Sequence, residues 1–198
     1  MPSRLAVVAL LVAGPAMGQP SKRIELVERI LAVVDDRPLF LSEVRTLGQV
    51  RRLDSAAALE AAIDERLMYA EAARLPQAEV AEEEVERALA LLAETSPEVV
   101  STVPAPELRR LLRRQATIVK YVEFRFRPQV RIAPAQVREA WERERAASGP
   151  GFEEAAPAVR ARLERRAVDE RIEEWVSDLR ARAEVRYVPA EGSAPEGP

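Results

Sequence analysis

The chain has 198 residues, the length of a single domain, and its composition excludes several classes of enzyme. It contains no His and no Cys, which excludes Ser-His and Cys-His triads, thiol redox sites, disulfides and most zinc sites. The formal net charge of −3 excludes a strong electrostatic attraction to nucleic acid or anionic membranes. Charged residues make up 32% of the chain and Gly only seven positions, which predicts a mainly α fold with ion pairs along its helices.

Residues 1–18 have the pattern of a cleaved secretory signal peptide. Arg4 precedes an apolar run at residues 5–13, and Ala16-Met17-Gly18 matches a small-residue cleavage site. The apolar run is far shorter than the roughly 20 residues of a membrane-spanning helix. We therefore expect a periplasmic mature chain that starts at Gln19, has no stable membrane insertion and carries a net charge of −4, from 29 basic and 33 acidic residues.

Both ends of the mature chain contain patterns typical of β-strands. The β-branched run Ile30–Val34 precedes a turn at Asp35–Pro38, and Leu39–Leu41 returns as a second short strand. Near the other end, Val185–Val188 alternates with a period of two, as a half-buried strand does. Because a single strand is not stable alone, we expect a small β-sheet formed by the N-terminal hairpin and the C-terminal strand.

The residues between these strands are mostly helical in pattern. Ser42 is the expected N-cap of a helix that ends near Leu53, and Arg45 at its N3 position indicates a simple cap rather than a capping box. The prolines of Pro97–Pro106 predict a loop that bends between two helices. Further helices are predicted at residues 56–75, 79–95, 107–127 and 135–147.

The region from Glu153 to Val188 predicts one long amphipathic helix followed at once by the C-terminal strand. Apolar residues recur along one stripe of this helix: Val159, Leu163, Ala167, Ile172, Trp175, Val176, Leu179 and Ala183. We expect the rest of the domain to pack on this stripe. The linker at Ser148–Gly151 precedes the helix, and the tail, residues 189–198, has the composition of a disordered segment.

Two charged clusters have a functional and a structural interpretation. The acids of Glu82–Glu86 could ligate a metal, but adjacent carboxylates on a helix point in different directions, which favours a solvated first turn near the helix dipole. Arg109, Arg110, Arg113 and Arg114 could bind phosphate, but an ion-paired surface is the better interpretation for an acidic chain. We therefore predict no catalytic, cofactor-binding or metal-binding residue, and neither a cofactor nor a nucleic acid partner.

Aromatic residues in the helix at 107–127 are not all on its main apolar stripe. Phe124 lies nearly opposite the centre of that stripe, and Tyr121 lies well to one side. One interpretation is that the helix is sandwiched and Phe124 packs on a second neighbour. The other is that Phe124 belongs to an apolar surface that binds a partner or an unfolded chain.

Three segments, taken together and in order, resemble the SurA-type periplasmic chaperones and their parvulin-like relatives. They are ILAVVDDRPLFLSEV at Ile30–Val44, AAIDERLMYAEAARLPQAEVAEEEVERAL at Ala61–Leu89, and the helix and strand at Phe152–Val188. The resemblance implies a helical chaperone core at residues 19–188, made of an N-terminal part at 24–132 and a C-terminal helix and strand at 152–188. Only residues 130–151 lie where relatives carry a prolyl-isomerase domain, so no such domain fits.

The resemblance also implies an ATP-independent holdase that binds unfolded outer-membrane or other envelope proteins without chemical turnover. The candidates for contact with such clients are Phe40, Tyr121, Phe124, Phe126 and Trp141, although the core is the favoured position for Phe126 and Trp141. Two alternatives stay open: a structural or assembly subunit that binds one envelope partner, and a peptidyl-prolyl isomerase-related enzyme.

Overall fold

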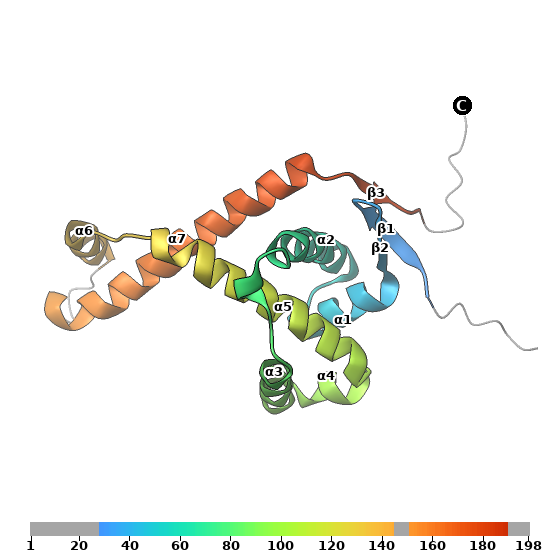
Figure 1. Ribbon diagram of the computed structural model, residues 1–198. Coiled ribbons are helices and arrows are strands. Elements are labelled where there is room, and N and C mark those ends of the chain that lie inside the picture. The colour runs from blue at the N-terminus through green and yellow to red at the C-terminus, as the bar shows by residue number, and fades with distance from the viewer. Residues whose placement is uncertain (1–27, 145–150, 190–198) are drawn as a thin grey trace, which may run out of the picture.

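The computed structural model describes residues 28–144 and 151–189 and is mainly helical, with one small sheet (Figure 1). The predicted signal peptide, the start of the linker at residues 148–150 and the tail from residue 190 lie outside the described residues. The strands are β1 (Ile30–Val34), β2 (Arg37–Phe40) and β3 (Val185–Tyr187). The helices are α1 (Leu41–Arg51), α2 (Ser55–Ala72), α3 (Glu82–Thr95), α4 (Pro97–Thr102), α5 (Ala105–Arg125), α6 (Pro134–Glu144) and α7 (Phe152–Arg182), with single 3₁₀ turns at η1 (Pro76–Ala78) and η2 (Arg127–Gln129).

The three strands form an antiparallel sheet in the order β2-β1-β3, which confirms that the two ends of the chain meet. Asp35 and Asp36 join β1 to β2 with φ angles of 45° and 63°, the left-handed pair that a tight hairpin turn requires. The same turn holds the start of β3, because Asp35 and Glu184 exchange two hydrogen bonds of 2.9 and 3.0 Å. Ala32 and Val34 of β1 point into the core and are fully buried.

Several predicted boundaries were wrong by two or three residues. The helix α1 begins at Leu41, so Ser42 lies inside it and is not its N-cap. Glu43, not Arg45, is at the N3 position, and its carboxylate accepts a hydrogen bond of 3.2 Å from the backbone N–H of Phe40. The strand β2 ends one residue earlier than predicted, and the region predicted as a loop at Pro97–Pro106 contains the short helix α4.

The long helix α7 is present, but its apolar stripe does not pack on one body as predicted. Its first half packs on α6, through Val137, Ala140 and Val159, and on Ile132 just before α6, and Trp141 meets Phe152 edge-on at 5.7 Å. These two segments form an arm that extends away from the remaining elements (Figure 1). The second half of α7 packs on α2 and joins the main core.

A cluster of three aromatic rings lies where α7 enters the main core. Trp175 stacks on Tyr121 with the ring centroids 4.8 Å apart and meets Phe126 edge-on at 5.4 Å. Tyr121 and Phe126 also contact one another, at 5.9 Å. Trp175 is only 8% exposed, so the cluster joins the end of α5 to α7 at the base of the arm.

The C-terminal part of α7 is tied to α2 by polar contacts around Arg180. Its guanidinium pairs with Asp64 and donates a hydrogen bond of 2.9 Å to the carboxylate of Glu60. The hydroxyl of Tyr187, on β3, donates to the other oxygen of Glu60 at 2.8 Å. Burial opposes ionisation of Glu60, but the hydrogen bonds from Tyr187 and Arg180 outweigh it and lower the pKa of this carboxyl.

Trp175→Ala is expected to destabilise the fold by about 3–5 kcal/mol, because it removes the ring that both Tyr121 and Phe126 contact. Urea unfolding followed by circular dichroism measures the change. Phe124→Ala is the control, since that ring is 53% exposed and its removal should change the free energy of unfolding by less than about 0.5 kcal/mol. Equal effects of the two substitutions would contradict the assignment of the cluster to the core.

Glu60→Gln is expected to make the fold less sensitive to acid. The pKa of Glu60 is lower in the folded chain than its ordinary value of 4.5, so its contribution is complete above that value and is lost as the pH falls through the folded pKa. Because the side chain is 47% exposed, the effect is small. Urea unfolding from about pH 5 to about pH 3 should show a shallower loss of stability in the variant than in the wild type. Parallel curves for the two proteins would rule out a role for this carboxyl.

Candidate functional site

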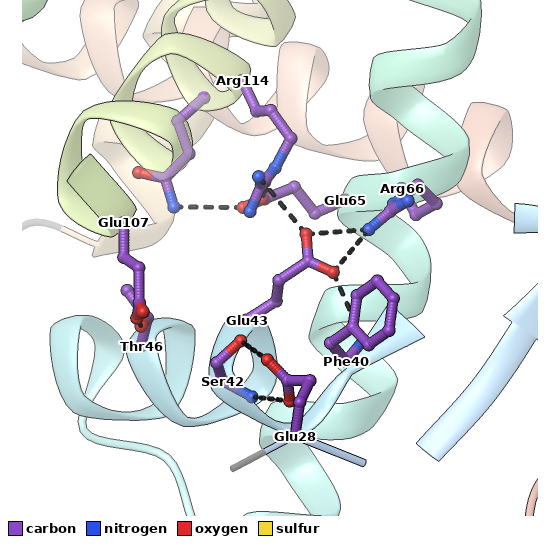
Figure 2. Close-up of polar contacts among 10 residues, drawn as sticks. Glu28, Phe40, Ser42, Glu43, Thr46, Glu65, Arg66, Glu107 and Arg114 are labelled. Atoms are coloured by element: carbon purple, nitrogen blue, oxygen red, sulfur yellow. Dashed lines mark hydrogen bonds and ion pairs between the residues drawn. The ribbon is translucent and has the colours of Figure 1, made fainter. Parts of the chain in front are cut away.

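A network of charged side chains joins α1, α2 and α5 beneath the surface (Figure 2). The side chain of Glu65, on α2, is only 3% exposed and accepts hydrogen bonds from Arg114 at 2.9 Å and from Gln115 at 3.1 Å, both on α5. Arg51, on α1, lies 3.8 Å from the same carboxylate. A buried carboxylate is stable only where such partners replace its water, so Glu65 fixes the position of α5 against α2.

Glu43 extends this network toward the sheet. Its carboxylate accepts two hydrogen bonds from Arg66, at 2.8 and 2.9 Å, and lies 3.5 Å from Arg114 (Figure 2). Because Glu43 also caps the N-terminus of α1 at Phe40, one side chain sets the start of α1 and links it to both α2 and α5. At the same end of α1, Ser42 donates a hydrogen bond of 2.6 Å from its hydroxyl to Glu28.

Three consecutive residues of the segment Ala61–Leu89, the apolar Ile63 and the acids Asp64 and Glu65, contact three different parts of the fold. Ile63 is fully buried in the core, Asp64 binds Arg180 on α7, and Glu65 binds Arg114 on α5. One turn of α2 therefore carries the contacts that hold α5 and α7 in place. These contacts give each of the three residues a structural role.

The clusters Glu82–Glu86 and Arg109–Arg114 pair largely with each other. Glu82 binds Arg113, Glu86 binds Arg109 at 2.7 Å, and Glu84 binds Lys120 at 2.6 Å. Three of the acids of α3 are therefore in ion pairs with α5, and these pairs hold α3 along α5. Arg110 is the member of the arginine cluster without an ion-pair partner among the described residues.

An open groove of about 680 Å³ lies between β1, α1 and the start of α2. Its lining is mainly apolar: Leu31, Leu41, Val44, Gly48, Leu53, Ala56, Ala58 and Leu59, with Arg29, Arg45, Gln49 and Ser55 at polar positions. Leu53 is 37% exposed, so apolar surface in the groove faces solvent. We call this feature the α1–α2 groove.

The base of the groove depends on a close approach between its two helices. A Cβ atom added at Gly48 would lie 3.1 Å from the Cβ atom of Ala58, closer than nearly all such contacts, so these small residues allow α1 and α2 to meet there. Arg52 adopts a left-handed conformation, with φ of 56°, and ends α1 so that the chain can turn into α2. The turn leaves Leu53 at the mouth of the groove.

The structure does not bring the five predicted client-contact residues into one surface. Tyr121 and Phe126 pack with Trp175 at the core, and Trp141 contacts Phe152 in the arm. Phe40 is half-buried on β2, at the end of the molecule opposite α6 (Figure 1). Phe124 is 53% exposed, so it is not covered by a second neighbour and remains a candidate for contact with a partner.

The groove residues were not predicted from the sequence. Leu31, Leu41 and Leu59 come from three separate elements and each follows the ordinary pattern of a core residue. Only Leu53, an apolar residue between Arg52 and Asp54 in a turn, stands outside such a pattern. This exposed turn leucine is the signal that could have indicated the groove.

Neither a scan of protein-family models nor a search of curated proteins finds a match to this chain. Within residues 28–144 and 151–189, no helix has the length and apolar character needed to cross a lipid bilayer.

Glu65→Ala is expected to destabilise the fold by about 3–5 kcal/mol, because it leaves Arg114, whose side chain is 16% exposed, without its main partner. Urea unfolding measures the change, and Glu139→Ala is the matched control. Glu139 and its partner Arg143 are 71% and 66% exposed, so this control should leave the stability close to that of the wild type. An equally small effect of both substitutions would show that the buried network does not hold α5 on α2.

Proposed function

We propose that the mature chain is an ATP-independent periplasmic holdase that keeps unfolded outer-membrane or other envelope proteins from aggregating. The observation that carries the proposal is the α1–α2 groove, an open hollow of about 680 Å³ with a mainly apolar lining. Open apolar surface of this kind is what an extended polypeptide needs for its own apolar side chains. The pattern of residues 1–18 supports a periplasmic location, and the resemblance of three segments to SurA-type chaperones supports the class of client.

The shape of the groove fits a segment of unfolded chain better than a folded partner. It is bounded by two helices and a strand, and its lining combines short and long apolar side chains, from Ala56 and Ala58 to Leu41 and Leu59. Such a surface offers contact to many apolar sequences and hydrogen bonds to few, which is suited to broad specificity. Phe124, exposed on α5, would add a second apolar contact for a long client.

The first test is the aggregation of a urea-diluted outer-membrane β-barrel protein, followed by light scattering, with and without the mature chain from Gln19. We expect suppression at a near-stoichiometric ratio in the absence of nucleotide, because the groove binds the unfolded client before it aggregates. If the chain is folded and helical by circular dichroism and yet does not suppress aggregation, the proposal is wrong.

Leu53→Gln tests whether the groove is the client surface. Loss of one apolar contact of this size should weaken client affinity about tenfold, from roughly 1.4 kcal/mol of lost binding free energy. Leu91→Gln is the matched control, since Leu91 is 60% exposed on α3 and does not line the groove. Phe124→Ala, measured in parallel, reports whether clients also contact α5. If Leu53→Gln suppresses aggregation as well as Leu91→Gln does, the groove is not the site.

The arm favours one alternative, an assembly subunit that binds a single envelope partner. The arm formed by α6 and the first half of α7 packs on itself, and long protruding helices of this kind can hold a folded protein. A pull-down from the envelope distinguishes the two functions. A broad set of unfolded clients supports the holdase. One stoichiometric partner that is lost when exposed residues of α6 (Pro134–Glu144) are substituted supports the subunit.

A further inference from the structure

Two hollows adjoin each other on the side of α1 and α2 that faces α5. The first, of about 280 Å³, is lined by Arg37, Glu43, Arg66, Tyr69, Arg110, Arg113 and Arg114, and we call it the basic hollow. The second, of about 340 Å³, is lined by the apolar residues Ala73, Leu75, Pro76, Ala78 and Val80 and by Tyr69, Glu79, Arg113 and Thr117, and we call it the apolar hollow after the first five. Tyr69 and Arg113 line both hollows, so the two are neighbours.

The basic hollow carries an excess of positive charge. Of its five arginines, Arg66 and Arg114 pair with Glu43, Arg114 also pairs with Glu65, and Arg113 pairs with Glu82. Arg37 and Arg110 form no ion pair with any residue that the structure describes, and both are exposed. Five guanidinium groups thus face three carboxylates, which leaves an excess of two positive charges on a chain whose net charge is negative. Two unpaired guanidinium groups in one hollow favour the binding of an anion.

The apolar hollow offers apolar surface on its η1 side and polar groups from Tyr69, Glu79, Arg113 and Thr117 around it. Ala78 and Val80 are nearly buried and form its floor, while Leu75 and Pro76 border its opening. Its wall is rigid, because η1 begins with a proline and Lys120 holds the adjacent chain by a hydrogen bond of 2.6 Å to the backbone carbonyl of Glu79. An apolar side chain in this hollow would be removed from water and would lie next to Arg113.

We propose that the two hollows form one site for a polypeptide segment in which a carboxylate adjoins an apolar side chain. The carboxylate, from an acidic side chain or from the C-terminus of the segment, binds between Arg37 and Arg110, and the apolar side chain enters the apolar hollow. A single carboxylate suits the site better than a phosphate dianion does, because Glu43 forms part of the wall. The inference rests on the proposed function because it takes the ligand to be a polypeptide. It adds a second binding site, which prefers segments with a carboxylate next to an apolar side chain.

Fluorescence anisotropy of labelled peptides tests this site directly. The probes are Gly/Ser peptides with an amidated C-terminus that contain one Leu-Glu pair, one Leu-Gln pair or one Ser-Glu pair, and a peptide that ends in Leu with a free carboxylate. We expect the Leu-Glu peptide to bind at least about tenfold more tightly than the Leu-Gln and Ser-Glu peptides. Comparison with the peptide ending in Leu shows whether the carboxylate of a side chain or of a C-terminus is preferred.

Variants of the chain assign the binding to the two hollows. Arg37→Gln with Arg110→Gln should weaken binding of the Leu-Glu peptide about tenfold and leave the melting temperature unchanged, since neither arginine is in an ion pair. Arg131→Gln with Arg165→Gln is the matched control, because it makes the same change in net charge at two exposed positions away from the hollows. Leu75→Ser should weaken the Leu-Glu peptide and not the Ser-Glu peptide.

Equal losses in the two double variants would overturn the inference, because they would show a general effect of charge. It would also be overturned if inorganic phosphate bound to the basic hollow while the Leu-Glu and Leu-Gln peptides bound equally. Neither result would contradict the proposed holdase function, because that proposal assigns suppression of aggregation to the α1–α2 groove. If the chain neither suppresses aggregation nor binds any peptide, the proposed function itself is wrong.

Discussion

The buried carboxylate of Glu65 is the constraint on which the arrangement of the helices depends. With its side chain 3% exposed, it must keep Arg114 and Gln115 of α5 within hydrogen-bond distance, and it can do so only if α5 crosses α2 at one place. Apolar contacts between Ala-rich and Leu-rich helices would tolerate several registers. The charged contacts select one of them, and this selection places Arg114 of α5 beside Glu43 and Arg66 in the wall of the basic hollow.

The helix α7 has two different roles because its apolar stripe changes partner along its length. Val159 and Leu163 face α6, whereas Val168, Ile172 and Leu179 face the main core. The change of partner coincides with the end of α5, where Trp175 stacks on Tyr121. A single long helix is stiff, so the arm keeps a defined direction relative to the core even though α6 and the first half of α7 pack mainly on each other.

The sequence predicted the sheet well because the relevant signals are local. Residues 30–34 are all apolar and Ile30, Val33 and Val34 are β-branched, and Asp35 and Asp36 are residue types that accept positive φ, so the hairpin follows from its own residues. The N-terminus of α1 was misplaced because Ser42 and Glu43 are both good residues near a helix start. The contact of Ser42 with Glu28, which lies 14 residues earlier, decided between them, and no helix pattern contains that information.

The candidate site could be predicted much less well, for a physical reason. Periodicity shows which face of a helix is apolar, but it does not show which neighbour covers that face. Tyr121 and Phe126 are as apolar as Phe124, yet Trp175, about 50 residues away, covers the first two and leaves the third exposed. In the same way, the sequence does not distinguish Arg110 from Arg109 and Arg113. The difference is that acids of α3 form ion pairs with Arg109 and Arg113.

Glu43 links stability and binding within one side chain. It caps α1, neutralises Arg66 and Arg114, and forms part of the wall of the basic hollow. Removal of its charge would make the hollow more positive and would also weaken the contacts that hold α1 on α2 and α5. Arg37 and Arg110 form no ion pair within residues 28–144 and 151–189, so their charges can vary without loss of the buried network. A preference for acidic segments can therefore be tuned at these two exposed positions, while the buried network keeps the shape of the site constant.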